Sequence, residues 1–559
     1  MYYYDILTVC LGTAMCVLCF FFTGYAAKNL NPAFRLMYFL PAVTVLAVAY
    51  ANGTDKSMIP VYTGAVICAL GFFRDKASFR RLISFVSALS MLAAVPVCLL
   101  YKGYRSPDYS KEFDEIIRVF RQRYILSEWK GIDYDELYAK YKPMFDKAQE
   151  DHDEAENYAA MLAFLSEFHD GHVSYGYRRE YFLEENTILS DILGEDHGLV
   201  LMNLEDGSTV AVQVDKALDE KGIHNGTIIT SWNGRPIEES AAAVPVSFSL
   251  TDGHICFTAD AENRYFYRST LLAGTGGDSV EVGFISDDGS ERTTSLKSEG
   301  SYYSRLKEAM NRLDQGVEGA NFSWSTAKGG IPVLLIKSMF FDQRSSDEEM
   351  TQPEKSYAEM KESIRKNINE AKDKGVNDLI IDLRNNSGGS GNLIRAIAEV
   401  IGTEGEHLYN YNGVWDRTNR RYLKDPDGKF LLGKKNTFES EGLLDKGKIV
   451  ILVNAGSISA ADHLVHVMSQ MDNVTVMGFT KTNGSAQGVT GIELEKSFIA
   501  MSGSMMLDED GTPFVDSGID GISENSLDIR VPFDKEALKA IFDNNEDYLL
   551  EKAVEYINQ

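Results

Sequence analysis

A serine at the start of an expected helix is the first residue of this sequence that could do chemistry. The stretch VNAGSISAADHLVHVM, residues 453–468, continues the apolar run KIVILV, and Ser459 follows a short turn. A serine in this place is either a helix cap or a nucleophile. The unpaired N–H groups of a first helical turn could receive an oxyanion, so the stretch is compatible with hydrolysis.

Two histidines lie close to this serine in the sequence. His463 and His466 follow Ser459 by four and seven residues on the same helix, which is about 6 and 10 Å along its axis. His463 could approach the serine because helical side chains lean towards the N-terminus, but it would have no fixed partner. Both are therefore interpreted as residues of the helix face, and a base has to come from elsewhere.

Three other glycine-containing motifs accompany the serine stretch. HDGHVSYGY contains His172 between a helix and an extended segment, DLRNNSGG covers residues 382–389, and GFTKTNGSAQG covers residues 478–488. DLRNNSGG and the serine stretch each leave a strand through a Gly/Ser turn into a helix. Catalytic groups favour such turns at the carboxyl ends of strands.

The surrounding pattern predicts the elements that position these motifs. Residues 108–170 have apolar residues at helical spacing, and residues 186–300 form short strands separated by Gly and Asp turns. Residues 331–540 alternate strands and amphipathic helices, which predicts an α/β layered core. Residues 217–239, ALDEKGIHNGTIITSWNGRPIEE, resemble the second half of a PDZ domain, with Gly226-Thr227 in place of the usual Gly-Asp.

In this order the motifs resemble the C-terminal processing peptidases, also called tail-specific proteases, including their tricorn-type core. The resemblance covers about residues 108–535. It implies a ClpP/crotonase-like layered protease core, a PDZ-like domain, and a peptide or protein substrate that is often held by its C-terminus.

The resemblance also implies roles for residues of the serine stretch and the glycine loop. Ser459 would be the nucleophile, and Ser457 would be the turn residue. The oxyanion would be held by backbone N–H groups, of Ala460 and of the pair Gly388 and Gly389. Asp382 and Arg384 are expected to hold the glycine loop.

The family supplies its base in two ways. One branch uses a lysine in the turn after the serine helix, where this chain has Gly484, with Lys481 three residues early and Gln487 one position out of register. The tricorn-like branch uses a histidine before the PDZ-like domain, which here is His172. The resemblance therefore implies His172 as the base, and the Ser/Lys dyad is not expected.

The third member of a triad would be a carboxylate that orients the imidazole. The family places it near the end of the core, before a motif that this chain lacks in its usual form. Asp516 is the favoured candidate, and Asp520 and Glu524 are the alternatives.

Composition limits the other functions. The 559 residues carry a net charge of -27, which argues against nucleic-acid binding because phosphate contacts need a basic face. Five of the six cysteines lie in the first hundred residues, so the remainder has no disulfide framework. No metal site or cofactor is implied, and the oligomeric state is not indicated.

Four apolar runs before residue 102 predict an N-terminal bundle of transmembrane helices, at residues 5–25, 36–51, 58–73 and 82–101. The loops that would share one side carry six basic residues and the other side three, which predicts that the catalytic part faces away from the cytoplasm. The lipid bilayer is thus an expected partner, and the location is the membrane of a cell, with a bacterial cell favoured.

The resulting hypothesis is a membrane-anchored serine endopeptidase of several domains. They are a membrane domain at 1–102, a helical part with the DGH motif at 103–185, the PDZ-like domain at 186–300, and the α/β catalytic core at 301–559. A catalytically inactive peptide-binding scaffold with a protease fold remains the alternative. A hydrolase of esters or cell-wall material is a third option.

Overall fold

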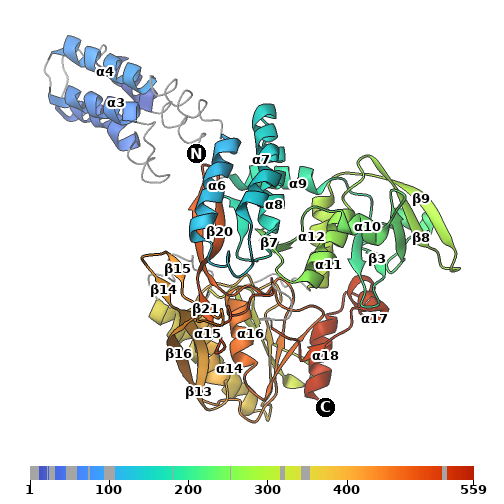
Figure 1. Cartoon of the computed structure of the whole chain (residues 1–559). Helices are drawn as coiled ribbons and strands as arrows, with labels where there is room; N and C mark the ends of the chain where they lie inside the picture. Colours follow the sequence, from blue (N-terminus) through green and yellow to red (C-terminus); the bar gives the residue numbers. More distant parts are fainter. Residues whose placement is uncertain are drawn as a thin grey trace. The chain divides into compact units, whose positions relative to one another are not determined.

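The computed structural model describes eleven stretches of the chain: residues 12–21, 23, 32–45, 59–73, 76–92, 108–178, 181–251, 254–314, 321–340, 353–518 and 525–559. These residues form two compact units, residues 1–108 and residues 109–559 (Figure 1). Each unit is described by itself.

The first unit consists of short helices. They are a helix at 12–21, a 3-10 segment at Pro32–Phe39 that continues as a helix to residue 45, α3 at Ile59–Ala69, and α4 at Ala77–Leu92. Its interior includes the buried residues Tyr38 and Met91 and the cysteines Cys16, Cys19 and Cys68, which are free thiols.

The predicted bundle of transmembrane helices is wrong. A helix needs about 20 apolar residues to cross the hydrocarbon core, whereas α3 has 11 residues and α4 has 16. No helix among the described residues combines the length and the apolar character that a span requires. The predicted multi-pass membrane location depended on these spans, and it is therefore wrong as well. Parts of the predicted spans, such as residues 5–11 and 93–101, lie outside the described residues.

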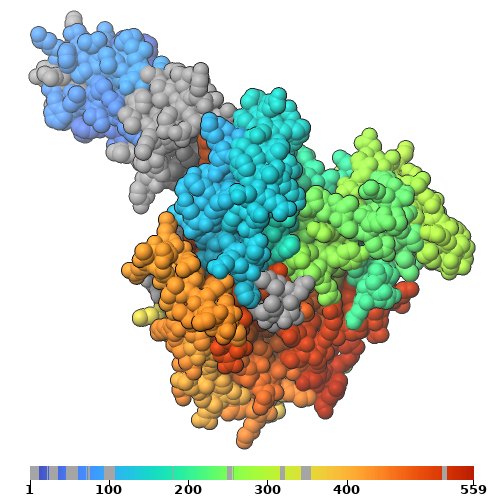
Figure 2. All heavy atoms as spheres, in the orientation of Figure 1, coloured from blue at the N-terminus to red at the C-terminus, as the bar shows by residue number. Residues whose placement is uncertain are grey.

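The second unit begins with the helices expected between residues 108 and 170. They are α6 at Tyr109–Arg123, α7 at Tyr134–Asp151 and α8 at Glu154–Ser166. They pack around fully buried aromatic rings, among them Phe113, Phe120 and Phe164. Asp133 and Asp153 cap α7 and α8 by accepting backbone N–H groups of the first turn. Figure 2 shows these helices, in blue to cyan, against the orange surface of the core.

A β-rich segment follows the helices and α9 at Phe182–Leu193. Its strands form a hairpin of β2 (Val200–Asn203) and β3 (Thr209–Val212), a four-stranded sheet in the order β5 (Arg235–Pro236), β4 (Ile229–Trp232), β8 (Ser279–Ile285), β9 (Glu291–Lys297), and a second hairpin of β6 (Phe248–Thr251) and β7 (His254–Phe257). The segment also contains the helices α10 (Ile237–Ala242) and α11 (Ala261–Leu272). After β9, α12 (Tyr302–Leu313) leads to the core. The PDZ-like character and the domain boundaries remain predictions.

The core is built on a six-stranded sheet. Its strands are, in spatial order, β10 (Phe322–Thr326), β11 (Pro332–Ile336), β12 (Leu379–Asp382), β17 (Ile449–Leu452), β18 (Val474–Gly478) and β22 (Ile529–Arg530). All pairs from β11 to β22 are parallel, and β10 is antiparallel at the edge. The α/β character predicted for this part is confirmed.

Helices cover both faces of this sheet. On β12, Leu379 and Ile381 belong to one buried cluster with α14 (Pro353–Lys372), α15 (Gly391–Ile401) and α16 (Ala460–Met468). Ile380 points into the other cluster, which includes residues of α18 (Tyr548–Ile557). A parallel sheet buried on both faces needs strands that are apolar throughout, as β17 is with the sequence IVIL.

The core also carries smaller sheets, which bring the DGH motif to the large one. β13 (Gly405–Gly413) pairs with β16 (Leu432–Ser440) and β21 (Met506–Leu507), and β20 (Ser497–Ser504) pairs with β19 (Gly488–Glu493). β1 (Ser174–Tyr177) completes the latter sheet, with Ser174 opposite Ala500. Because β1 starts two residues after His172, this pairing anchors the DGH loop on the core.

Candidate active site

Ser459 ends a turn that is held by side chains at both ends. Ser457 Oγ donates to the carbonyl of Leu383 at 2.8 Å and accepts the N–H of Asn454 at 3.1 Å, so Ser457 is the turn residue. Asn454 Oδ1 accepts the N–H of Gly456 at 3.0 Å. The turn therefore has a fixed shape before the chain reaches Ser459.

The backbone of Ser459 is strained. Its φ of 63° and ψ of -115° are unusual for a residue with a side chain. Its N–H donates to the carbonyl of Ser485 at 2.9 Å, and its side chain makes no capping bond to α16. Ser459 is half-buried. The hydroxyl of Ser459 is therefore not used to cap the helix that follows it.

The glycine loop after β12 lies directly against this serine. A Cβ atom on Gly388 would come within 2.5 Å of the Cβ of Ser459, and Gly388 and Gly389 have φ values of 82° and 138°. These positions therefore require glycine. Arg384 holds the start of the loop, because its guanidinium bonds Asp382 and Asp547 at 2.6 to 2.9 Å.

The N–H groups near Ser459 are not equivalent. The N–H of Gly388 already donates to Oδ1 of the buried Asn386 at 2.9 Å. The N–H groups of Gly389 and Ala460 have no acceptor among the described residues. Two of the three candidates from the sequence are thus available to an oxyanion.

His172 is buried in the same neighbourhood. The preceding Gly171 donates its N–H to Ser485 Oγ at 2.7 Å, and a Cβ atom on Gly171 would lie 2.5 Å from the Cδ1 of Ile458. Ser485 therefore bonds the loop of His172 through its hydroxyl and Ser459 through its carbonyl. Both ring nitrogens of His172 lack a hydrogen-bond partner among the described residues.

Burial lowers the pKa of His172, and the nearby carboxylate of Asp170 opposes this shift. The neutral imidazole is thereby favoured, which is the form that accepts a proton. Asp170 does not orient the ring. Its carboxylate accepts the backbone N–H of His172 at 2.9 Å, the Ser502 hydroxyl at 2.7 Å and the Tyr124 hydroxyl at 3.1 Å.

Asp516 lies near this site but is bonded to other groups. Its Oδ1 accepts Lys130 Nζ at 2.7 Å, and its Oδ2 accepts Trp129 Nε1 at 2.9 Å. The side chains of Lys130 and Asp516 are 4% and 1% exposed, so this is a buried ion pair. The structure does not bring the Asp516 carboxylate into hydrogen bonding with His172. The alternatives Asp520 and Glu524 lie outside the described residues.

The ion pair of Lys130 and Asp516 nevertheless contacts both the DGH loop and Ser485, which bonds the serine turn. Lys130 Nζ also donates to the carbonyl of His169 at 2.9 Å, at the start of the DGH loop. Asp516 lies opposite Ser485 in a short antiparallel bridge. Lys130 was not a candidate from the sequence, and no local pattern marks it, because its partner lies 386 residues away.

Asp462 is a second residue that the sequence analysis missed. Its carboxylate accepts the N–H groups of Gly484 and Ser485 at 3.1 and 3.0 Å. Burial raises its pKa to about 6. Asp462 follows Ser459 by three residues in SAAD, the spacing of the two polar residues in a capping box. This pattern could have marked Asp462 in the sequence.

The remaining sequence candidates have structural surroundings. His463 Nε2 lies 3.1 Å from the carbonyl of Tyr409, and its ring and that of His466 pack on Phe514. A Cβ atom on Gly484 would lie 1.9 Å from Ser517 Oγ, so this position has no room for a lysine. Among the described residues, no group of three metal-ligating side chains comes together.

Comparison with solved structures gives the fold. A crystal structure of a CPAF mutant is 14% identical, with a TM-score of 0.52, 81% of this chain and 97% of that chain covered. Mature CPAF complexed with lactacystin has 14% identity, a TM-score of 0.49, and coverage of 81% and 98%. The photosystem II D1 C-terminal processing protease has 16% identity, a TM-score of 0.33, and coverage of 78% and 98%. Of these three structures, the CPAF mutant has a TM-score above 0.5. Because its sequence identity is only 14%, this similarity shows a shared fold and no more.

Comparison with family models gives the relationship. No match is found among curated proteins. Residues 106–163 match the Tricorn protease C1 domain, and residues 342–521 match peptidase family S41. The chain therefore contains one region similar to peptidase family S41 and one region similar to the Tricorn protease C1 domain.

Proposed function

We propose that this chain is a serine endopeptidase of the C-terminal processing type, with Ser459 as the nucleophile and His172 as the base. The observation that carries the proposal is the strained backbone of Ser459, whose hydroxyl makes no capping bond and which lies against Gly388. Such strain persists where a function maintains it.

In the proposed reaction, His172 takes the proton of Ser459 as the hydroxyl attacks the carbonyl carbon of a peptide bond. The N–H groups of Ala460 and Gly389 stabilise the negative oxygen of the tetrahedral intermediate. The imidazolium then gives its proton to the leaving amine, and an acyl-enzyme remains. Water, activated by the same histidine, releases the acid product and restores the serine.

The buried and neutral state of His172 supports this role, because an uncharged ring can accept a proton at neutral pH. Its two ring nitrogens have no partner in the described part of the chain, so substrate binding has to bring the ring and the hydroxyl into contact. Catalytic hydrogen bonds are often long in unliganded enzymes and tighten with substrate. We propose further that the β-rich segment at 186–300 holds the substrate by its C-terminus, as PDZ domains do.

A catalytically inactive peptide-binding scaffold is the second candidate. It is favoured by the ring of His172, which has no carboxylate partner among the residues described, and by the ion pair that occupies Asp516. The two candidates differ in turnover and agree in peptide binding.

The test is labelling of the full chain with a fluorophosphonate probe, followed by mass spectrometry of the labelled peptide. Wild type should carry the label on Ser459, and Ser459→Ala should carry none. His172→Ala should label roughly 10² to 10⁴-fold more slowly. His466→Ala is the matched control, and its labelling rate should equal that of wild type. Folded wild type that stays unlabelled would exclude the enzyme and leave the scaffold. A parallel panel of ester substrates distinguishes an esterase from a peptidase.

A further inference from the structure

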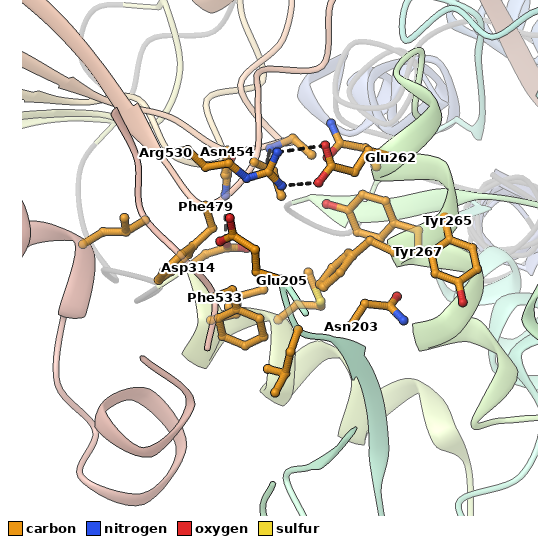
Figure 3. Close-up of a pocket in the computed structure, with 18 of the residues that line it drawn as sticks. Asn203, Glu205, Glu262, Tyr265, Tyr267, Asp314, Asn454, Phe479, Arg530 and Phe533 are labelled. Atoms are coloured by element: carbon orange, nitrogen blue, oxygen red, sulfur yellow. Dashed lines mark hydrogen bonds and ion pairs between the residues drawn. The ribbon is translucent and has the colours of Figure 1, made fainter. Parts of the chain in front are cut away.

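A cavity of about 420 Å³ lies between the β-rich segment and the core. Figure 3 shows Phe479 and Phe533 on the side of the core and Tyr265 and Tyr267 on α11. Its lining does not include Ser459 or His172, but it does include Asn454 of the serine turn. Aromatic rings on two sides make its walls largely apolar, which suits an apolar side chain.

Two polar groups of this cavity have no partner. Asn263 is 1% exposed, and its Nδ2 donates to no acceptor among the described residues. The Oδ1 of Asn203 likewise receives no hydrogen bond in the described part of the chain, although its Nδ2 donates to Thr209 Oγ1 at 3.0 Å. Buried polar groups are nearly always satisfied. Both atoms are buried, so they reach a ligand only when the two amides rotate towards the cavity; the unused donor and acceptor then match the C=O and N–H of a peptide group.

The charges of the lining are unbalanced. Glu205, Glu262 and Asp314 contribute carboxylates, and Arg530 is the basic residue among the described lining residues. Arg530 already pairs with Glu262 at the rim, as the dashed lines in Figure 3 mark. Asp314 accepts a hydrogen bond from Asn454 Nδ2 at 2.6 Å, and burial raises the pKa of this carboxyl group. An added ammonium group would bring a second positive charge to a lining that has three carboxylates.

We propose that this cavity binds the amino-terminal end of an apolar peptide, with its ammonium group on Asp314. The side chain of the first residue packs among the aromatic rings. Its first peptide group bonds the free atoms of Asn203 and Asn263. Capture of an N-terminus differs in chemistry from the capture of a C-terminus expected for the β-rich segment.

Asn454 connects the cavity to the serine turn. Its Nδ2 donates to Asp314, and its Oδ1 accepts the N–H groups of Asn385 and Gly456 at 2.9 and 3.0 Å. A ligand on Asp314 therefore restrains the residue that shapes the turn before Ser459. This effect on the serine rests on the proposed function, whereas the binding itself does not.

The experiment is calorimetric titration of the full chain with the dipeptide amide Phe-Leu-NH₂, and with its N-acetylated form as the matched ligand. We expect the free amine to bind and the acetylated form to bind at least roughly tenfold more weakly, since a hydrogen bond to a charged group is lost. Asp314→Asn should weaken the free amine to the same degree and leave the acetylated form unchanged. Glu220→Gln, at an exposed carboxylate that does not belong to the lining, should bind as wild type does.

Equal binding of both ligands, or equal binding by wild type and Asp314→Asn, would overturn amine recognition. Absence of any heat up to millimolar ligand in folded protein would overturn the site. Asn263→Leu keeps the size of the side chain and removes the donor, and it should weaken both ligands alike. Fluorophosphonate labelling with and without ligand then reports on the serine turn. A wild type that binds the amine but never labels contradicts the proposed function and leaves the binding site standing.

Discussion

Two neighbouring strands of the core end in turns that do different work. β12 and β17 run parallel, with Asp382 opposite Leu452, and each leads through a turn into a helix. The turn after β12 reaches positive φ at Gly388 and Gly389, after Asn385 has done so. The turn after β17 reaches positive φ at Ser459.

The difference shows where strain is tolerated. Glycine adopts positive φ without penalty, so the first turn uses it where the backbone N–H matters and a side chain is not needed. A serine in such a conformation costs of order 1–3 kcal/mol. The second turn accepts this cost at one residue, and neighbouring residues hold that residue in place, notably Ser485 and Ser457. Ser459 thus keeps a side chain in a conformation that glycine would adopt more easily, which supports a role for that side chain.

The largest effect should come from removal of the buried ion pair between Lys130 and Asp516. Asp516 pairs with Ser485, and Ser485 in turn bonds Ser459. Lys130→Met leaves the Asp516 carboxylate buried without its cation, and such a loss costs about 3–5 kcal/mol. The unfolding midpoint in urea should fall, and the rate of fluorophosphonate labelling should fall more than the loss of folded protein explains, because Ser485 then loses its support.

The matched control for this variant is Lys140→Met. Lys140 Nζ lies 2.6 Å from Glu167 Oε1, but the two side chains are 58% and 34% exposed. An exposed pair contributes about 1 kcal/mol or less. Equal loss of stability in the two variants would contradict the structural role of the buried pair. Unchanged labelling by folded Lys130→Met would show that the serine turn does not depend on it.

The glycine loop should be the next most sensitive element. Gly388→Ala places a methyl group 2.5 Å from the Cβ of Ser459 and adds a left-handed backbone penalty of roughly 1–2 kcal/mol. Ser459 or the loop has to move, so labelling should drop while the fold survives. Gly428→Ala, at a φ of 86° with no atom within 4 Å of the new Cβ, carries the same backbone penalty without the clash. Similar labelling by both variants would contradict the expected effect of the Gly388 contact on Ser459.

The sequence predicted the parts of the site that depend on local pattern. The apolar runs before 382 and 453, each followed by glycine, serine and a helix, predicted the two turns and the α/β core. The motif also predicted that no catalytic lysine occupies position 484. The structure gives the physical reason, because Ser517 leaves no room for a side chain on Gly484.

Other features depend on partners that are distant in the sequence. The sequence favoured Asp516 as the acid, but in the structure its carboxylate pairs with Lys130, which no nearby residue indicates. The membrane prediction was made from the length of the apolar runs, whereas the helices described within those runs are shorter than a span requires. In the first unit the described helices end too early, at 11 residues for α3 and 16 for α4.

The pH dependence of labelling should be a smaller effect. His172 has to be neutral to accept the proton, and burial lowers its pKa below the usual 6.5. The labelling rate should therefore rise with pH through a midpoint below 6.5 and stay level above it. Asp462 titrates nearby, at about 6, so Asp462→Asn is measured beside wild type. A midpoint above 6.5, or one that disappears in Asp462→Asn, would contradict the assignment to His172.

The smallest effect tests the strain itself. Ser459→Ala and Ser459→Gly both remove the hydroxyl, which makes no capping bond, and they differ in what a φ of 63° costs. Glycine should be the more stable variant by roughly 1 kcal/mol, because it relieves the left-handed penalty. At Ser469, with a φ of -66° at the end of the same helix, the order should reverse, since alanine is the better helix residue by roughly 0.5–1 kcal/mol. Calorimetric unfolding midpoints of the four variants give both signs. If alanine is the more stable variant at both serines, the backbone of Ser459 stores no strain, and the contrast between the two turns fails.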